Sequence, residues 1–149
     1  WSRGLGDVYK RQGIDRGLFD VARYHQVADA IDAALEHLQV VVDVTVACPF
    51  HPDHTPSYGS SHEAMRKPGA GMLALIAKRY SALTAHSLIV GDRQSDMQAG
   101  KAAGLPCGIF VGDRELKASD DADFQIYRCA AVEETAAFFT QSAVRLLKL

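Results

Sequence analysis

The sequence predicts one α/β domain in which a mainly parallel sheet is covered by helices on both faces. At 149 residues the chain has the length of a single domain, and its 48% apolar and 23% charged residues are ordinary for a globular protein. Short apolar runs at residues 40–47, 87–90 and 106–112 alternate with segments in which apolar residues recur every three or four positions. This alternation of strands and helices is typical of a parallel sheet between layers of helices.

The bulk properties exclude several classes of function. A net charge of −2 gives no reason to expect a nucleic acid or an anionic membrane as a partner. No apolar run approaches the length of a membrane span. The three cysteines, Cys48, Cys107 and Cys129, are widely spaced, which indicates reduced thiols in a cytoplasmic protein rather than a disulfide framework.

Residues 1–12 do not match the rest of the chain. They show no apolar periodicity and no signal-peptide layout. Residues 3–12 resemble translated sequencing-adapter readthrough, so we expect residues 1–12 to be non-native and the domain to occupy residues 13–149. The alternative is a genuine short strand at residues 7–10.

Residues 20–38 form the clearest predicted helix. Asp20 can cap its N-terminus. His25 and His37 lie off its apolar stripe or at the margin, and we interpret them as solvated side chains. The stripe consists of Val21, Tyr24, Val27, Ala28, Ile31, Leu35 and Leu38.

The next two segments are a strand and a long loop. Residues 40–47 are rich in β-branched side chains and predict a strand buried on both faces. Residues 48–68 contain several prolines and predict a loop without regular secondary structure, a kind of loop that usually has a function. A helix is predicted at residues 70–80, and its core-facing side chains are Met72, Leu73, Leu75, Ile76 and Ala77.

The second half repeats the strand and helix alternation. Residues 87–90 predict a strand, and residues 97–104 a short helix closed by glycine. A buried strand at 106–112, an exposed polar segment at 113–123, an edge strand at 124–127 and a final helix at 132–147 follow. Cys107 and Cys129 are predicted to be buried, inert thiols.

Two carboxylates follow the strand at residues 87–90. Ligands of open parallel sheets collect outside the carboxyl ends of the strands, where Asp92 is expected, and Asp96 comes one helical turn later. Carboxylates there suit Mg²⁺, and Lys67 from another loop could neutralise charge on a phosphoryl group. The alternative interpretation is an acidic turn that caps a helix, with Arg66 and Lys67 as a solvated basic loop end.

Four short segments together resemble a known family. Residues 91–100 (GDRQSDMQAG) resemble the last acidic motif of haloacid-dehalogenase-like (HAD-like) phosphatases. Residues 66–72 (RKPGAGM) resemble the Arg-Lys-Pro-x-Pro-Gly-Met motif of the branch that holds histidinol phosphatases and heptose 1,7-bisphosphate 7-phosphatases. Residues 13–17 (GIDRG) and 48–52 (CPFHP) resemble the Gly-Ile-x-Arg-Gly and Cys-Pro-x-His-Pro segments of the heptose enzymes.

The resemblance implies a Rossmann-like three-layer α/β/α fold and hydrolysis of a phosphate monoester through an aspartyl-phosphate. It implies that Asp92 binds Mg²⁺, that Lys67 steadies the phosphoryl oxygens, and that Asp96 orients Lys67 or a metal-bound water. The substrate would be a small sugar phosphate, with the heptose bisphosphate favoured over histidinol phosphate, and the full-length protein a monomer. The implied substrate-binding residues are Gly13, Arg16, Arg66, Lys67 and Arg93.

The family's first motif has no counterpart in this sequence. Members begin with a strand that ends in Asp-x-Asp, the nucleophile and the general acid/base, and a second strand supplies Thr-Asn-Gln. The one early acid here is Asp7, with no second acid two residues later. We therefore expect a domain that lacks its first strands, and a chain without turnover.

The loop after Cys48 departs from the zinc-binding loop of many relatives. Those relatives use Cys-x-His and a later Cys-x-Cys, whereas this sequence has Phe50 at the histidine position and Glu63 and Met65 at the later cysteines. A structural zinc site needs four nitrogen or sulfur ligands, so zinc is not favoured. The remaining alternative ligand set is Cys48, His51, His54 and His62.

Two other classes of protein stay open. A non-catalytic phosphate-binding module would have the same phosphate site without a nucleophile. A response-regulator receiver domain would need an acidic pair near the N-terminus and a lysine after a late strand. Lys67 precedes Asp92 here, which argues against the receiver.

Overall fold

The structure is a computed structural model that describes residues 6–9, 17–18, 20–51, 53, 59–116 and 122–138. Its described elements alternate between strands and helices, as the sequence predicts for an α/β fold. In chain order they are β1 (Gly6–Tyr9), α1 (Val21–His37), β2 (Val44–Ala47), α2 (Ser60–Met65), α3 (Gly71–Tyr80), the 3₁₀ turn η1 (Thr84–His86), β3 (Leu88–Gly91), α4 (Gln94–Ala102), β4 (Cys107–Val111), β5 (Gln125–Cys129) and α5 (Val132–Phe138).

The described strands form two parallel sheets. One contains β1 and β2, and the other has the order β3-β4-β5. In the second sheet Gly91 of β3 is level with Phe110 of β4, and Val111 of β4 is level with Cys129 of β5. The carboxyl ends of these three strands therefore meet at one edge. The strand predicted as an alternative at residues 7–10 is present as β1, whose origin stays a hypothesis.

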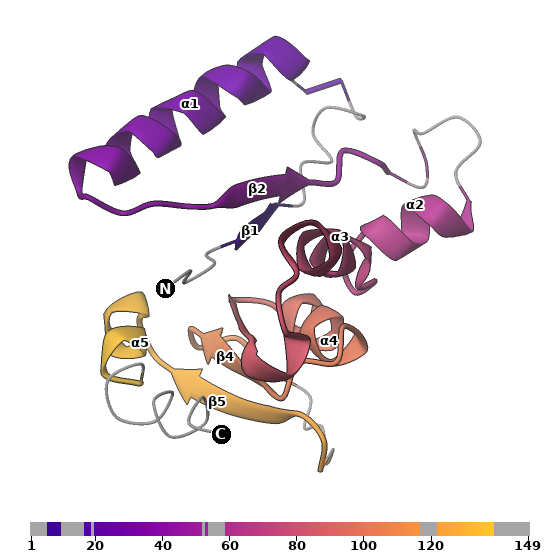
Figure 1. The fold of residues 1–149 in the computed structure, drawn as a ribbon, viewed down its shortest axis with the longest axis vertical. Helices are drawn as coiled ribbons and strands as arrows, with labels where there is room; N and C mark the ends of the chain where they lie inside the picture. The colour runs from indigo at the N-terminus through magenta and orange to yellow at the C-terminus, as the bar shows by residue number, and fades with distance from the viewer. Residues whose placement is uncertain are drawn as a thin grey trace.

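The helices pack against the two sheets separately. Figure 1 shows α1 running along β2, with α4, β4 and β5 in the other half of the molecule. Helix α3 contacts β1 and β2, whereas α4 contacts β3 and β4. The segment between α3 and β3 connects the two halves, and Lys67 in the turn before α3 contacts Asp96 in the first turn of α4. Within the part of the chain that the structure describes, no helix has the length and apolarity that crossing a membrane requires.

Helix α1 confirms the predicted cap and partly buries the predicted apolar stripe. Asp20 Oδ1 accepts a hydrogen bond from the Arg23 backbone N–H at 2.7 Å, which satisfies one of the free N–H groups of the first turn. His25 and His37 are exposed, as predicted. The middle of the stripe is partly buried, and its two ends, Val21 and Leu38, are exposed.

The strand predicted at residues 40–47 is shorter than expected. It begins at Val44, and Val44–Ala47 pair with the described residues of β1, Gly6–Tyr9. Val41 is 78% exposed, and within β2 Thr45 is exposed and the other residues are only partly buried, so the prediction of burial on both faces is wrong. The β-branched pattern indicates the strand but not the extent of its partner.

A short helix interrupts the loop predicted at residues 48–68. Helix α2 begins after Gly59, whose carbonyl oxygen accepts from the Glu63 N–H at 3.0 Å. The Gly59 N–H donates to His62 Nδ1 at 3.3 Å, so the side chain of this helix residue caps its own N-terminus. The prediction of a loop without regular secondary structure is therefore wrong over Ser60–Met65.

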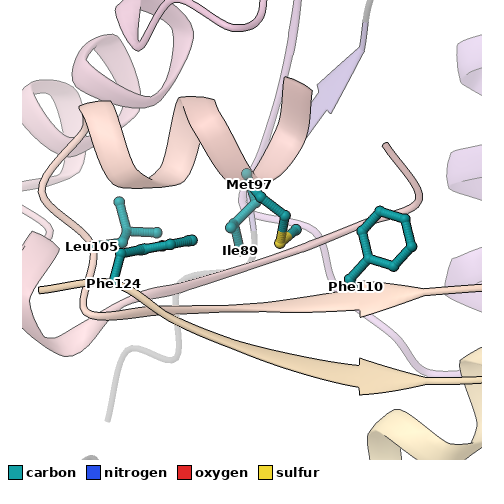
Figure 2. Close-up of a cluster of buried hydrophobic side chains, with 5 residues drawn as sticks. All are labelled: Ile89, Met97, Leu105, Phe110 and Phe124. Atoms are coloured by element: carbon teal, nitrogen blue, oxygen red, sulfur yellow. The ribbon is translucent and has the colours of Figure 1, made fainter. Parts of the chain in front are cut away.

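A buried apolar cluster holds α4 against β3 and β4. Figure 2 shows Met97 pointing from α4 toward the strands, close to Ile89. A Cβ on Gly108 would lie 2.7 Å from Met97 Sδ and 3.0 Å from Phe124 Cζ, so glycine at this strand position lets the side chains of the cluster pack closely. The cluster consists of Ile89, Met97, Leu105, Phe110 and Phe124.

Three further predictions can be compared with the structure. Helix α3 buries Met72 as predicted, but Leu75 is exposed. Helix α4 begins at Gln94, three residues before the predicted start at Met97, because Asp96 bonds back to the turn and draws it into the helix. Residues 113–115 are exposed as predicted, and the predicted residues 117–121 and 139–147 lie outside the described residues.

The three cysteines are buried. Burial raises the pKa of the Cys107 thiol, because desolvation disfavours the thiolate. This agrees with the prediction that Cys107 and Cys129 are buried.

Candidate active site

Lys67 and Asp96 form an ion pair that is largely shielded from solvent. Lys67 Nζ lies 2.5 Å from Asp96 Oδ1, and the two side chains are 15% and 6% exposed. Lys67 comes from the turn between α2 and α3, and Asp96 from the first turn of α4. Charged groups are rarely buried unless they are paired, so the fold has brought two distant segments together around this contact.

The second carboxylate oxygen of Asp96 is also bonded. Asp96 Oδ2 accepts a hydrogen bond from the Arg93 backbone N–H at 3.0 Å. The carboxylate lies at the N-terminal end of α4, where the helix dipole favours a negative charge. Asp96 is therefore fixed at both oxygens, and its geometry suits a residue that positions Lys67.

Gly91 leaves the space that the Asp96 side chain fills. A Cβ on Gly91 would lie 2.5 Å from Asp96 Cβ and 2.6 Å from Asp96 Oδ2. Any larger residue would force the carboxylate away from Lys67. Gly91 has no role of its own among the predictions from the sequence; the signal for its role is that it precedes Asp92 in the acidic motif.

The turn that carries Lys67 is packed against the end of α2. A Cβ on Gly69 would collide with the Ala64 carbonyl oxygen, and one on Gly71 would lie 2.6 Å from the same atom. The Gly69 N–H donates to the Arg66 carbonyl oxygen at 2.7 Å, and the Lys67–Pro68 peptide bond is cis. The two glycines allow the turn to pass closely beside α2 just after Lys67.

Arg66 has a polar atom that is buried and unpaired. Its Nε has no hydrogen-bond partner among the described residues. A buried N–H without an acceptor costs free energy, of the order of 1–3 kcal/mol. An anion beside Arg66 and Lys67 would supply the missing acceptor.

Asp92 lies in a different environment from Asp96. It directly follows β3, and its side chain is 62% exposed. Arg114 Nη1 lies 3.6 Å from Asp92 Oδ2, and the Arg114 side chain is 58% exposed. Arg114 is not among the residues predicted from the sequence; the signal for it is that β4 runs parallel to β3, so residues shortly after both strands meet at one edge.

The carboxylates fit Mg²⁺ through Asp92. Both oxygens of Asp96 are engaged, whereas Asp92 presents an exposed carboxylate at the carboxyl end of a strand. Mg²⁺ is usually bound by one or two carboxylates together with waters and substrate phosphate oxygens. In the described part of the chain no three His, Cys, Asp or Glu side chains gather into a metal-binding group, so most of the coordination would come from such oxygens.

The structure places the remaining predicted substrate residues as follows. Arg66 adjoins Lys67, and the Arg93 side chain is exposed beside the first turn of α4. Gly13 and Arg16 lie outside the described residues. The roles of these four residues therefore stay predictions.

The alternative zinc set does not form a metal-binding group among the described residues. Cys48 is buried, and His51 Nδ1 accepts from the Asp53 N–H at 3.2 Å. His62 packs against Phe50 with ring centroids 4.4 Å apart, and its Nδ1 is bonded to Gly59. His54, the fourth residue of the set, lies outside the described residues.

Comparisons with known proteins agree with this arrangement. A family model described as HAD-hydrolase-like matches residues 64–130, which include Lys67, Asp92 and Asp96. A D-glycero-beta-D-manno-heptose-1,7-bisphosphate 7-phosphatase from Mesorhizobium japonicum is 38% identical over 104 residues, which is 70% of this chain and 48% of the relative. One of the same name from Bordetella bronchiseptica is 39% identical over 94 residues, 63% of this chain and 49% of the relative.

The chain spans about half the length of the curated relatives it matches. Among solved structures, a HAD-like phosphatase from Mesorhizobium loti superposes with a TM-score of 0.75 at 32% identity, covering 94% of this chain and 66% of that one. The D,D-heptose 1,7-bisphosphate phosphatase of B. bronchiseptica, complexed with magnesium and phosphate, gives 0.74 at 28% identity and covers 93% and 74%. By family model, curated relatives and solved structures, this chain is similar to the HAD-like phosphatases.

Proposed function

We propose that this chain is part of a D-glycero-D-manno-heptose 1,7-bisphosphate 7-phosphatase of the cytoplasm, an enzyme that hydrolyses a phosphate monoester of a sugar phosphate with Mg²⁺. The observation that carries the proposal is the shielded Lys67–Asp96 pair beside Asp92 at the carboxyl edge of a parallel sheet. The relatives with this name, and the magnesium and phosphate in one of them, support the substrate class and the metal.

Each residue of the site has a separate part in this proposal. Lys67 binds the phosphoryl oxygens, and Asp96 holds the ammonium group in place through the 2.5 Å contact. Arg66 and Arg93 bind the sugar phosphate, the first through its unpaired Nε. Asp92 supplies a carboxylate oxygen to Mg²⁺, which when bound neutralises charge on the transferring phosphoryl group.

We propose further that the 149-residue chain binds phosphate without turning it over. The family mechanism uses an Asp-x-Asp strand, and no Asp-x-Asp precedes residue 13 here. Lys67 can attract a phosphate group but has no nucleophile to present it to. Gly13 and Arg16, in the motif at residues 13–17, would border the substrate pocket.

The substrate assignment rests on that same motif and on the names of the relatives. A histidinol phosphate phosphatase is the second candidate, because residues 66–72 resemble the lysine motif that both groups of enzymes share. The two substrates differ in their second charged group. The heptose carries a second phosphate, whereas histidinol phosphate carries an amine and an imidazole.

Binding and release of phosphate test the proposal together. The chain and a Lys67→Ala variant would be titrated with heptose 1,7-bisphosphate and with histidinol phosphate in the presence of Mg²⁺. We expect the heptose bisphosphate to bind more tightly, the variant to lose this binding, and neither protein to release phosphate. Equal binding by Lys67→Ala would contradict the site, and Mg²⁺-dependent release above the variant would contradict the lack of turnover.

A further inference from the structure

The two ion pairs of the site differ in how firmly they are held. Lys67 Nζ and Asp96 Oδ1 are 2.5 Å apart, and both side chains are shielded from solvent. Arg114 Nη1 and Asp92 Oδ2 are 3.6 Å apart, and more than half of each side chain is exposed. Exposed pairs of this kind contribute little free energy, so the cation beside Asp92 can be exchanged while the cation beside Asp96 stays.

The backbone around Arg114 is fixed even though its guanidinium is exposed. Gly112 turns the chain after β4 with a φ of 108°, and its N–H donates to the Cys129 carbonyl oxygen at 2.9 Å. Arg128 Nη2 donates to the Arg114 carbonyl oxygen at 2.8 Å, and the Arg128 guanidinium lies 5.2 Å from the centroid of the Phe110 ring. A long side chain on a fixed backbone can therefore leave Asp92 and remain at the edge of the site.

We propose that Arg114 is an exchangeable counter-ion for Asp92, which a divalent cation displaces and which then binds an anionic group of the substrate. This rests on the proposed function, because Asp92 is its metal ligand. Arg114 would thereby act as a specificity residue for a substrate with more than one phosphate. A guanidinium suits this role because it binds phosphate oxygens through two parallel hydrogen bonds.

Manganese binding, followed by electron paramagnetic resonance, tests the exchange without requiring turnover. The proteins compared would be the unchanged chain, Arg114→Ala, and Arg79→Ala as a control. Arg79 is an exposed arginine in the last turn of α3, so its removal changes the net charge equally. We expect Arg114→Ala to bind Mn²⁺ about 2–5-fold more tightly than Arg79→Ala, because an exposed competing pair is lost.

A second measurement separates exchange from a general change in charge. With saturating Mn²⁺, we expect Arg114→Ala to bind heptose 1,7-bisphosphate several-fold more weakly than Arg79→Ala, while inorganic phosphate binds the two equally. Tighter metal binding with weaker bisphosphate binding would not follow from a purely structural role of Arg114.

The outcomes distinguish this inference from the proposed function. Equal or weaker Mn²⁺ binding by Arg114→Ala than by Arg79→Ala would overturn the inference and leave the metal site intact. Unchanged Mn²⁺ binding by Asp92→Asn would instead overturn the metal site itself. If Arg114→Ala does not fold, Arg114→Gln removes the charge with less loss of volume and is judged by the same comparison.

Discussion

Gly91 and Asp96 pack so closely that the carboxylate occupies the place where a side chain of residue 91 would be. A Cβ on Gly91 would lie 2.5 Å from Asp96 Cβ, which no real contact tolerates. Because Asp96 in turn holds Lys67, a residue without functional groups determines where the ammonium group of the site lies.

Gly91→Ala is therefore expected to weaken both the fold and the site. The added methyl group forces a shift in a packed region, which typically costs about 1–3 kcal/mol. Phosphate affinity should fall as well, because Asp96 and Lys67 move together. Chemical denaturation and phosphate titration check these effects, with Val90→Ala on the same strand as the control. Unchanged phosphate affinity in a destabilised Gly91→Ala protein would show that Gly91 does not determine the position of Lys67.

Replacing one partner of the Lys67–Asp96 pair is expected to lower the free energy of unfolding more than replacing both partners. Asp96→Asn leaves a shielded ammonium group without its counter-charge, and such losses reach about 3–5 kcal/mol. The double variant Lys67→Met, Asp96→Asn leaves no unpaired charge and should lose less than the sum of the two single variants. Urea denaturation of all four proteins gives the coupling free energy. Additive losses would show that the pair contributes nothing to folding.

Stability is expected to fall at alkaline pH because of Cys107. Burial raises the pKa of its thiol in the folded chain, so the unfolded chain loses the proton first as the pH rises. The stabilisation is complete below the ordinary thiol pKa and is lost as the pH passes through the higher folded value. Denaturation between pH 7 and 10 should show this slope, and Cys107→Ala should reduce it. If stability falls equally with pH in both proteins, groups other than Cys107 cause the loss of stability at alkaline pH.

The open edges of the two sheets are expected to promote self-association. Among the described strands, β3 pairs only with β4 and β1 only with β2, so each sheet presents an edge of unpaired backbone groups. Val90 on β3 is 45% exposed, and a charge there should oppose a second chain. Light scattering should show a concentration-dependent mass that Val90→Lys lowers. A monomer at all concentrations would contradict this expectation.

Local features of the fold follow from the sequence because their causes are local. The Asp20 cap needs only the first turn of α1. Short strands of buried residues such as Cys107–Val111 are visible in composition alone. The exposure of Val41 and Leu75 is different, because it depends on which segments cover them. The sequence pattern shows that such residues are apolar but not whether a neighbour is present.

The residues of the site also differ in whether the sequence reveals them. Lys67 and Asp96 lie in recognisable motifs, and the structure brings them into contact. Arg114 lies in a polar segment with no motif, and only the register of β3 and β4 places it beside Asp92. Helix α2 depends on a histidine that caps its own helix, which is an uncommon signal. Contacts between segments are therefore the part that sequence patterns do not reveal.

The most direct test of the central claim is a crystal structure of this chain with Mg²⁺ and inorganic phosphate. We predict one phosphate within hydrogen-bond distance of Lys67 Nζ, with Mg²⁺ on the Asp92 carboxylate beside it and Asp96 still bonded to Lys67. Phosphate and metal bound elsewhere, with the Lys67 and Asp92 side chains on opposite sides of the molecule, would contradict it.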